Sequence, residues 1–207
     1  MIRRTFLCFC VGICVWLAML SGCGSRQAYD KKFYIFNTTR NTESSTAKTN
    51  CVLEVRNFTI DSTFSSKGLV YRIGELEYES DFYNEFLVSP SAMVTEKTRT
   101  WLSNAGFCIR VLDPGSQVDP THLIEGNITE LYGDFRDKSS PIAVMEIRLF
   151  MLEAKKTGIE PVNIFGKTYT SSVALESKSA HGLVEAFERC LTEILTKVER
   201  DLLEKLL

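Results

Sequence analysis

The sequence predicts an α+β domain, with a mostly antiparallel β-sheet and two main helices packed on one face. Two segments of the 207-residue chain place apolar residues at helical spacing. Several other segments alternate apolar and polar residues, or are rich in β-branched and aromatic residues, and turn-forming residues separate them. The order along the chain is ββα-ββββ-α, which is typical of helices that cover one face of an antiparallel sheet.

The body of the domain is predicted to begin with a strand at Cys51–Val55. A second strand is predicted from about Leu69 to Tyr78, because Val70-Tyr71-Arg72-Ile73 has high β-propensity. Between these strands and the short apolar piece Phe33–Phe36 lies a segment, 37–50, made almost entirely of Ser, Thr, Asn and charged residues. This composition predicts a flexible linker.

The first helix is predicted to start with Ser89 as N-cap and Pro90 at the first helical position. Gly106 is the expected left-handed stop at its end. Between them, apolar residues recur on one helical face at Met93, Val94, Trp101, Leu102 and Ala105. These three signals together define a helix that covers the sheet.

Four further strands are predicted at 107–112, 123–135, 142–153 and 162–173, with Lys156-Thr157-Gly158 as the turn before the last one. The final segment, Ala180–Leu207, is predicted to be a long amphipathic helix. Its apolar stripe is Leu183, Phe187, Cys190, Leu191, Ile194, Val198 and Leu202. A core helix is the preferred interpretation, and a coiled coil or a membrane-surface helix is the alternative; the Leu-rich end 202–207 would suit a partner.

The first 22 residues have the pattern of an export signal. Arg3 and Arg4 form a charged tip, and Phe6 to Leu20 contains no charged residue. The following Leu20-Ser21-Gly22-Cys23 resembles the lipobox of bacterial lipoprotein precursors, and the alternative is an ordinary signal peptide with a chance cysteine. The resemblance implies cleavage before Cys23 and its acylation, for example with palmitate. Several acyl chains would hold the protein stably on a membrane surface.

The predicted organisation is therefore a signal peptide at 1–22, a lipidated N-terminus and flexible linker at 23–50, and a single α+β domain at 51–207. The whole chain has 24 basic and 26 acidic residues. Loss of Arg3 and Arg4 leaves 22 against 26, a net charge of −4. No basic face is visible, which argues against a nucleic-acid partner.

Three cysteines lie outside the signal and the lipid site: Cys51, Cys108 and Cys190. Their odd number and lack of CxxC spacing are not typical of a disulfide framework or a zinc site. We expect each to be a small core residue, with a Cys108–Cys190 disulfide as the alternative. The two histidines, His122 and His181, have no second ligand at metal spacing, and common catalytic motifs do not occur. No enzymatic activity, metal or cofactor is expected.

An aromatic-rich stretch is the most unusual feature of the predicted domain. Its preferred interpretation is packing between sheet and helix, and the alternative is a surface for a partner or for lipid. The residues concerned are Tyr71, Arg72, Tyr78, Phe82, Tyr83 and Phe86.

The order of these pieces resembles the ABC-type transport auxiliary lipoproteins (PqiC-like). The matching pieces are Leu69-Val70-Tyr71-Arg72, the aromatic stretch, Pro90 and its helix, Glu125-Gly126, the strand 144–152, Thr157-Gly158 and Phe165. Phe86-Leu87-Val88 stands where many relatives have a Trp, and the polar segment 37–50 replaces a Pro/Ala-rich linker.

The resemblance implies a non-enzymatic, membrane-anchored periplasmic subunit of a lipid transport system, with a fold similar to the N-terminal domain of TolB. Its partners would be an MCE-type substrate-binding protein and an ABC transporter, and family members can assemble as homo-oligomeric rings. Gly24 follows the cysteine where an Asp could retain a lipoprotein at the inner membrane, so the outer membrane is favoured. The alternative is another envelope-assembly lipoprotein, of the lipopolysaccharide-export or TolB-interaction kind.

Overall fold

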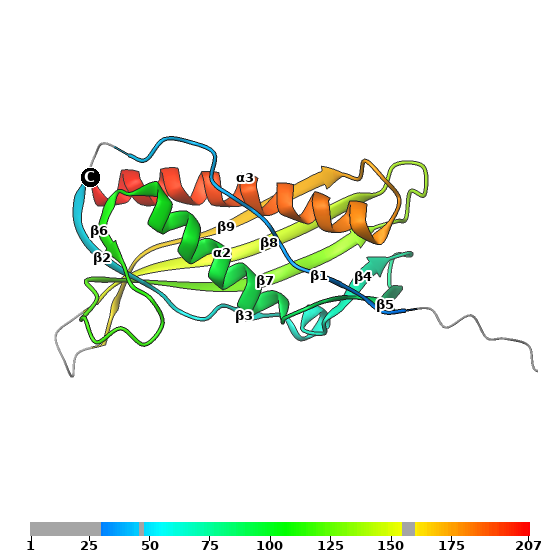
Figure 1. Ribbon diagram of the computed structural model, residues 1–207, viewed down its shortest axis with the longest axis horizontal. Coiled ribbons are helices and arrows are strands. Elements are labelled where there is room, and N and C mark those ends of the chain that lie inside the picture. The colour runs from blue at the N-terminus through cyan, green and yellow to red at the C-terminus, as the bar shows by residue number, and fades with distance from the viewer. Residues whose placement is uncertain (1–29, 46–47, 155–159) are drawn as a thin grey trace, which may run out of the picture. The chain divides into compact units, whose positions relative to one another are not determined.

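The computed structural model describes residues 30–45, 48–154 and 160–207, and Lys31–Leu207 form one compact unit with an α+β fold (Figure 1). This confirms the predicted fold class. The signal sequence, Cys23 and the turn at Lys156-Thr157-Gly158 lie outside the described residues.

The centre of the sheet is a meander of three long strands, β7 (His122–Asp134), β8 (Ile142–Glu153) and β9 (Val162–Ala174). β8 pairs antiparallel with β7 on one edge and with β9 on the other. The face of β8 that points into the core is the one that its period-two alternation predicts. The five residues on this face are each at most 1% exposed: Ala143, Met145, Ile147, Leu149 and Met151. The antiparallel meander is therefore confirmed.

Short strands occupy the other edge of β7. β2 (Thr49–Val55), β3 (Thr59–Ile60) and β4 (Gly68–Arg72) all pair with β7 in parallel. β6 (Cys108–Val111) extends the sheet beyond β2, also in parallel. The sheet is thus mixed, although its two longest ladders are antiparallel.

The predicted strand from Leu69 to Tyr78 is in fact two strands. β4 ends at Arg72, and β5 (Tyr78–Phe86) returns antiparallel to it. The chain reverses between them, where the backbone amides of Ile73 and Gly74 both donate to the carbonyl of Glu77. β1 (Lys32–Tyr34) then pairs in parallel with β5 and forms one end of the strand order.

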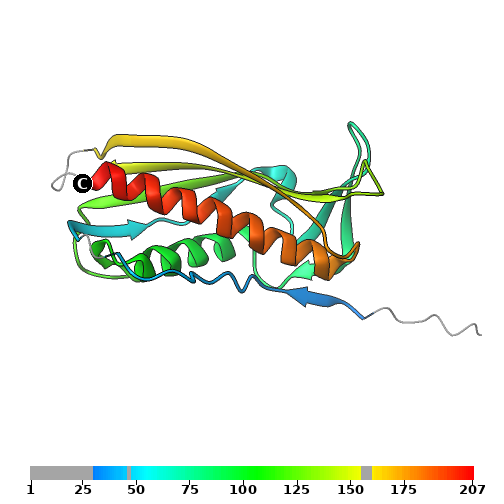
Figure 2. The ribbon, with the colours of Figure 1, turned by 90° about the horizontal axis from the view of Figure 1, so that it is seen from above.

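Both helices lie on one face of the sheet (Figures 1 and 2). α2 (Pro90–Ala105) has Ser89 as N-cap and ends at Gly106, whose φ of 72° is left-handed, as predicted. α3 (Ala180–Leu206) lies over β8 and β9. Its predicted stripe is buried throughout, which confirms a core helix. At its end, Leu203 and Leu206 pack against the core, whereas Leu207 is exposed.

The segment predicted to be a flexible linker is largely part of the folded unit. β2 begins at Thr49, two residues before the predicted domain start, and β1 belongs to the sheet. Between them, the buried side chain of Arg40 makes two hydrogen bonds to the carboxylate of Glu199 in α3, at 2.9 and 2.8 Å. Trp101 of α2 donates to the same carboxylate at 2.8 Å. Polar composition suggested flexibility here, but long-range pairing fixes residues 37–45.

The cysteines also differ from the prediction. Cys51 of β2 and Cys108 of β6 form a disulfide across these neighbouring strands, with their Cα atoms 4.6 Å apart. Both are buried in the core, as expected, but they are bonded to each other, so the alternative pairing of Cys108 with Cys190 is wrong. Cys190 is a free, buried thiol on α3, as expected for a core residue.

The disulfide should make a measurable contribution to stability, because it closes a loop with a sequence separation of 57 residues. We expect the Cys51→Ala/Cys108→Ala variant to lose about 4 kcal/mol of unfolding free energy, measured by urea denaturation. Reduction with dithiothreitol should destabilise the wild-type chain and leave this variant unchanged. An equal effect of reductant on both chains would contradict the pairing.

Candidate functional site

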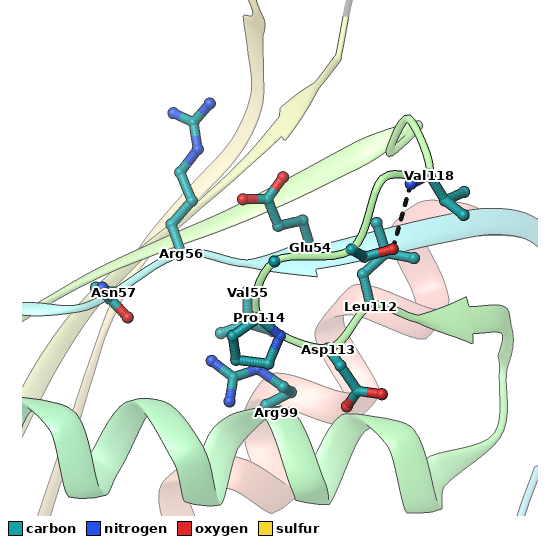
Figure 3. Close-up of a pocket in the computed structure, with 11 residues that line it drawn as sticks. Glu54, Val55, Arg56, Asn57, Arg99, Leu112, Asp113, Pro114 and Val118 are labelled. Atoms are coloured by element: carbon teal, nitrogen blue, oxygen red, sulfur yellow. Dashed lines mark hydrogen bonds between the residues drawn. The ribbon is translucent and has the colours of Figure 1, made fainter.

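One surface cavity, of about 450 Å³, lies between β2, α2 and the loop 113–118 (Figure 3). Arg99 rises from α2 toward Pro114, whereas Glu54 and Arg56 project from the opposite side of β2. Each arginine already has a carboxylate partner, since Arg99 pairs with Glu96 and Arg56 pairs with Glu125 at 2.6 Å. The charged groups around this cavity therefore do not converge on a common point where a reaction could occur.

A neighbouring cavity of about 730 Å³ contains His122. Nδ1 of His122 lies 2.8 Å from the hydroxyl of Thr121. That hydroxyl is already engaged with the backbone of Val52, because it accepts from the amide at 2.8 Å and lies 3.2 Å from the carbonyl. Burial lowers the pKa of His122, which favours the neutral ring. This arrangement links β2 to β7 rather than preparing a nucleophile.

The described part of the chain offers neither a metal-binding cluster nor a membrane-spanning helix. Within residues 30–45, 48–154 and 160–207, no group of three or more His, Cys, Asp or Glu side chains is placed to hold a metal ion. No helix in these ranges has both the length and the apolar character needed to cross a membrane.

The predicted aromatic stretch divides into a packed part and an exposed part. Phe86 is only 2% exposed and packs edge-on against Phe36, so the alternative that it belongs to a surface is wrong. Tyr71 is half-buried with its ring 5.3 Å from that of Phe135. Desolvation by burial, aided by Asp81, raises the pKa of the Tyr71 phenol.

Tyr78 and Arg72 are also held by neighbouring side chains. The ring of Tyr78 meets those of Phe64 and Tyr132 edge-on, with centroids 6.4 and 5.7 Å apart. The guanidinium of Arg72 lies 5.6 Å from the centroid of Tyr78. These contacts favour a packing role for both residues, although 40% of Tyr78 remains exposed.

Phe82 and Tyr83 are displayed by an irregularity in β5. Residues 68 and 70 of β4 pair with residues 85 and 80 of β5, so the intervening residues of β5 form a bulge. The carboxylate of Asp81 fixes this bulge, because it accepts hydrogen bonds from the amides of Tyr83 and Asn84 at 2.8 and 3.0 Å. It also accepts from the Asn84 side chain and from the Tyr71 hydroxyl.

A glycine on the neighbouring strand allows the bulge to approach. A Cβ atom at Gly68 would lie 2.5 Å from the hydroxyl oxygen of Ser80 and 2.7 Å from the carbonyl oxygen of Asp81. Any larger residue would therefore push the bulge away from β4. Gly68 and Asp81 act together to turn Phe82 and Tyr83 outward.

The bulge forms part of a larger apolar surface, which we call the edge patch. β1 contributes exposed side chains beside β5 because the two strands pair with Phe33 opposite Glu85 and Tyr34 opposite Phe86. Tyr34 and Phe36 face the core, so the alternating residues point the other way. The edge patch consists of Phe33, Ile35, Phe82, Tyr83, Leu87 and Val88, each between 42% and 66% exposed.

Sequence reasoning placed Phe82 and Tyr83 in a candidate surface but missed the other four members. Phe33 and Ile35 join it only through parallel pairing with a strand about 50 residues later. All four residues of Phe33–Phe36 are apolar or aromatic, so the sequence pattern did not indicate which of them would be exposed or which strand lies beside them. The edge patch is the surface best suited to binding among the described residues.

The fold is shared with solved structures of other proteins. Protein XCC0632 from Xanthomonas campestris, which carries the family-model description DUF330, matches with a TM-score of 0.69 and 16% identity over 83% of this chain and 95% of that chain. An uncharacterized protein matches with a TM-score of 0.64 and 11% identity over 84% and 99% of the respective chains. The hypothetical protein CT253 from Chlamydia trachomatis gives 0.52 and 13% over 74% and 96%. No family model and no curated protein matches the sequence.

Substitution of Gly68 should disturb the bulge. We expect Gly68→Ala to lower the unfolding free energy by about 2 kcal/mol, because the added methyl group overlaps the Asp81 carbonyl. The amides of Tyr83 and Asn84 should also exchange faster in hydrogen-exchange measurements. Gly74→Ala is the milder comparison, since its methyl group would lie 3.2 Å from the Cβ atom of Glu77 and no closer than 3.9 Å to a backbone atom. Equal destabilisation by the two substitutions would argue against a special role for Gly68.

Proposed function

We propose that this chain is a lipid-anchored periplasmic subunit of an ABC/MCE-type intermembrane lipid transport system, in which it acts as a docking component. The observation that carries the proposal is the kind of site the folded unit offers. Its described residues present an exposed apolar surface, and the charged groups around the cavity between β2 and α2 do not converge on a common point. Such a surface favours action through contacts rather than through chemistry.

Two further observations support the placement in the envelope. Leu20-Ser21-Gly22-Cys23 resembles a lipobox, and Cys23 is the residue that would carry the acyl chains. The Cys51–Cys108 disulfide suits an oxidising compartment such as the periplasm. The solved structure of a protein described as DUF330 supports the α+β fold on which the proposal rests.

The proposed partners are an MCE-type substrate-binding protein and the ABC transporter of the same system. A homo-oligomer is part of this proposal, whereas nucleic acid and cofactors are not. We place the anchor in the outer membrane, facing the periplasm, because Gly24 rather than Asp follows Cys23. The second candidate is another envelope-assembly lipoprotein, of the lipopolysaccharide-export or TolB-interaction kind, which the lipobox and fold would serve equally.

The anchor can be tested directly. We expect Cys23→Ala to abolish metabolic labelling with a palmitate analogue and to shift the protein out of the membrane fraction, because the thiol is the acceptor of the lipid. Cys14→Ala is the control, since it removes a cysteine of the signal segment and leaves the lipobox intact. A Cys23→Ala chain that still carries the label would exclude the lipoprotein assignment.

Affinity purification of the acylated chain from envelope extract separates the two candidates. The transport proposal predicts that an MCE protein co-purifies and that the ABC transporter follows it after mild crosslinking. Recovery of lipopolysaccharide-export or Tol components without an MCE protein would favour the second candidate instead.

A further inference from the structure

The edge patch draws its residues from β1, β5 and the segments that directly follow these strands. Phe33, Ile35 and Leu87 lie on the side of these strands that faces away from the core. The amide of Leu87 donates to the carbonyl of Tyr34, which keeps the two segments paired beyond the end of β1. The rings of Phe82 and Tyr83 meet edge-on, with centroids 5.3 Å apart. These residues make one surface drawn from two strands.

Exposed apolar residues are concentrated in this region. Eight of the twelve large exposed hydrophobic side chains among the described residues fall in 33–35 and 76–88. The other four are Ile109, Val118, Val162 and Leu207, and Ile109 is on β6, at the opposite end of the folded unit from β5 (Figure 1). A contiguous patch of this kind marks an interaction surface, whereas single exposed side chains are ordinary.

The edge patch begins close to the proposed anchor along the chain. Only the seven residues 24–30 separate Cys23 from Lys31, which directly precedes β1. Even a fully extended connection spans less than about 30 Å between the Cα atoms of Cys23 and Lys31. An acylated Cys23 therefore keeps Lys31, two residues before the first member of the edge patch, within about that distance of the acylated residue.

The chemistry of the edge patch suits the interfacial region of a bilayer. Phe82 has the ammonium group of Lys31 4.1 Å from its ring centroid, and Lys32 follows at the start of β1. Lys67 lies beside the edge patch, with its ammonium donating to the carbonyl of Leu87. Aromatic rings with nearby lysines can bury their apolar parts while the charged groups stay at the headgroups.

The neighbouring carboxylates do not oppose this placement. Glu85 pairs with Lys31 at 2.6 Å, and Asp81 is engaged in the hydrogen bonds that hold the bulge. Glu79 lies on β5 beyond the bulge, toward the turn from β4. The apolar side chains can thus approach lipid without burying an unpaired charge from Glu85 or Asp81.

A second copy of the chain is a less suitable occupant. β1 is an edge strand of only three residues, and Lys31 and Lys32 stand at its start. Short edge strands with lysines discourage strand pairing between molecules. We propose that the edge patch is a membrane-contact surface that docks into the headgroup region of the bilayer that holds the acyl anchor. This inference rests on the proposed lipid anchor and adds a second, non-covalent attachment that orients the folded unit.

Vesicle binding by the unacylated mature chain tests the proposal. The probe is residues 23–207 with Cys23→Ser, and the vesicles contain phosphatidylethanolamine and phosphatidylglycerol. We expect the chain to sediment with the vesicles, and we expect Phe33→Ser/Phe82→Ser to weaken this partitioning by about tenfold or more. Both side chains are exposed, so the folded unit should be unaffected.

Ile109→Ser/Val118→Ser is the matched control, because these residues are 63% and 43% exposed outside the edge patch. It should leave the partitioning unchanged. Absence of vesicle binding by the starting chain, or equal loss in both variants, would overturn the proposal. The proposal would also be overturned if the chain self-associated with rising concentration and only the edge-patch variant abolished this association. The edge patch would then be an interface between two copies of the chain.

Fluorescence gives an independent readout of insertion. In a Tyr83→Trp variant, vesicles of brominated lipid should quench the new indole. Trp101 should remain unquenched, because it is 5% exposed and hydrogen-bonded to Glu199. If brominated lipid leaves the emission of the introduced indole unchanged, the proposal is also overturned. Neither assay uses an acylated Cys23, so failure here leaves the anchor and the transport proposal to be judged by labelling and co-purification.

Discussion

The fold depends on β7 being paired along both of its edges. β8 occupies one edge over the whole strand, while β2, β3 and β4 follow one another along the other edge. The three early strands β2, β3 and β4 therefore take their places in the sheet by pairing with a strand that comes later in the sequence. At Gly126 of β7, an added Cβ atom would lie 2.5 Å from the ring of Phe58. That glycine allows the connection from β2 to β3 to pack closely on the sheet.

Features set by local chemistry were predictable from the sequence. The cap at Ser89, the stop at Gly106 and the buried face of β8 all follow from neighbouring residues and repeat periods. Features set by distant contacts were not predictable. The Cys51–Cys108 disulfide requires β2 to lie beside β6, and the order of residues 37–45 requires Glu199 to meet Arg40. The spacing of residues in the sequence identifies neither the cysteine that pairs with Cys51 nor the carboxylate that pairs with Arg40.

The candidate site also combines features that local sequence predicts with features that depend on distant contacts. Composition identified an aromatic stretch, but it could not distinguish a buried ring such as Phe86 from an exposed one such as Phe82. The difference arises from the bulge in β5, which depends on Asp81 and on the missing side chain of Gly68. A strand with regular pairing would have alternated the rings strictly between its two faces. The irregularity places Phe82 and Tyr83, which are adjacent in sequence, at the surface together.

The position of β1 has a mechanical consequence. The chain enters the folded unit at Lys31, so tension on the N-terminal segment reaches β1 before any other element. Tension directed along β1 loads its backbone hydrogen bonds to β5 together, in shear. The Lys31–Glu85 ion pair reinforces this junction, and Arg40 with Glu199 forms a second point of resistance further along the chain. Load applied at Lys31 would therefore meet these two attachments in turn.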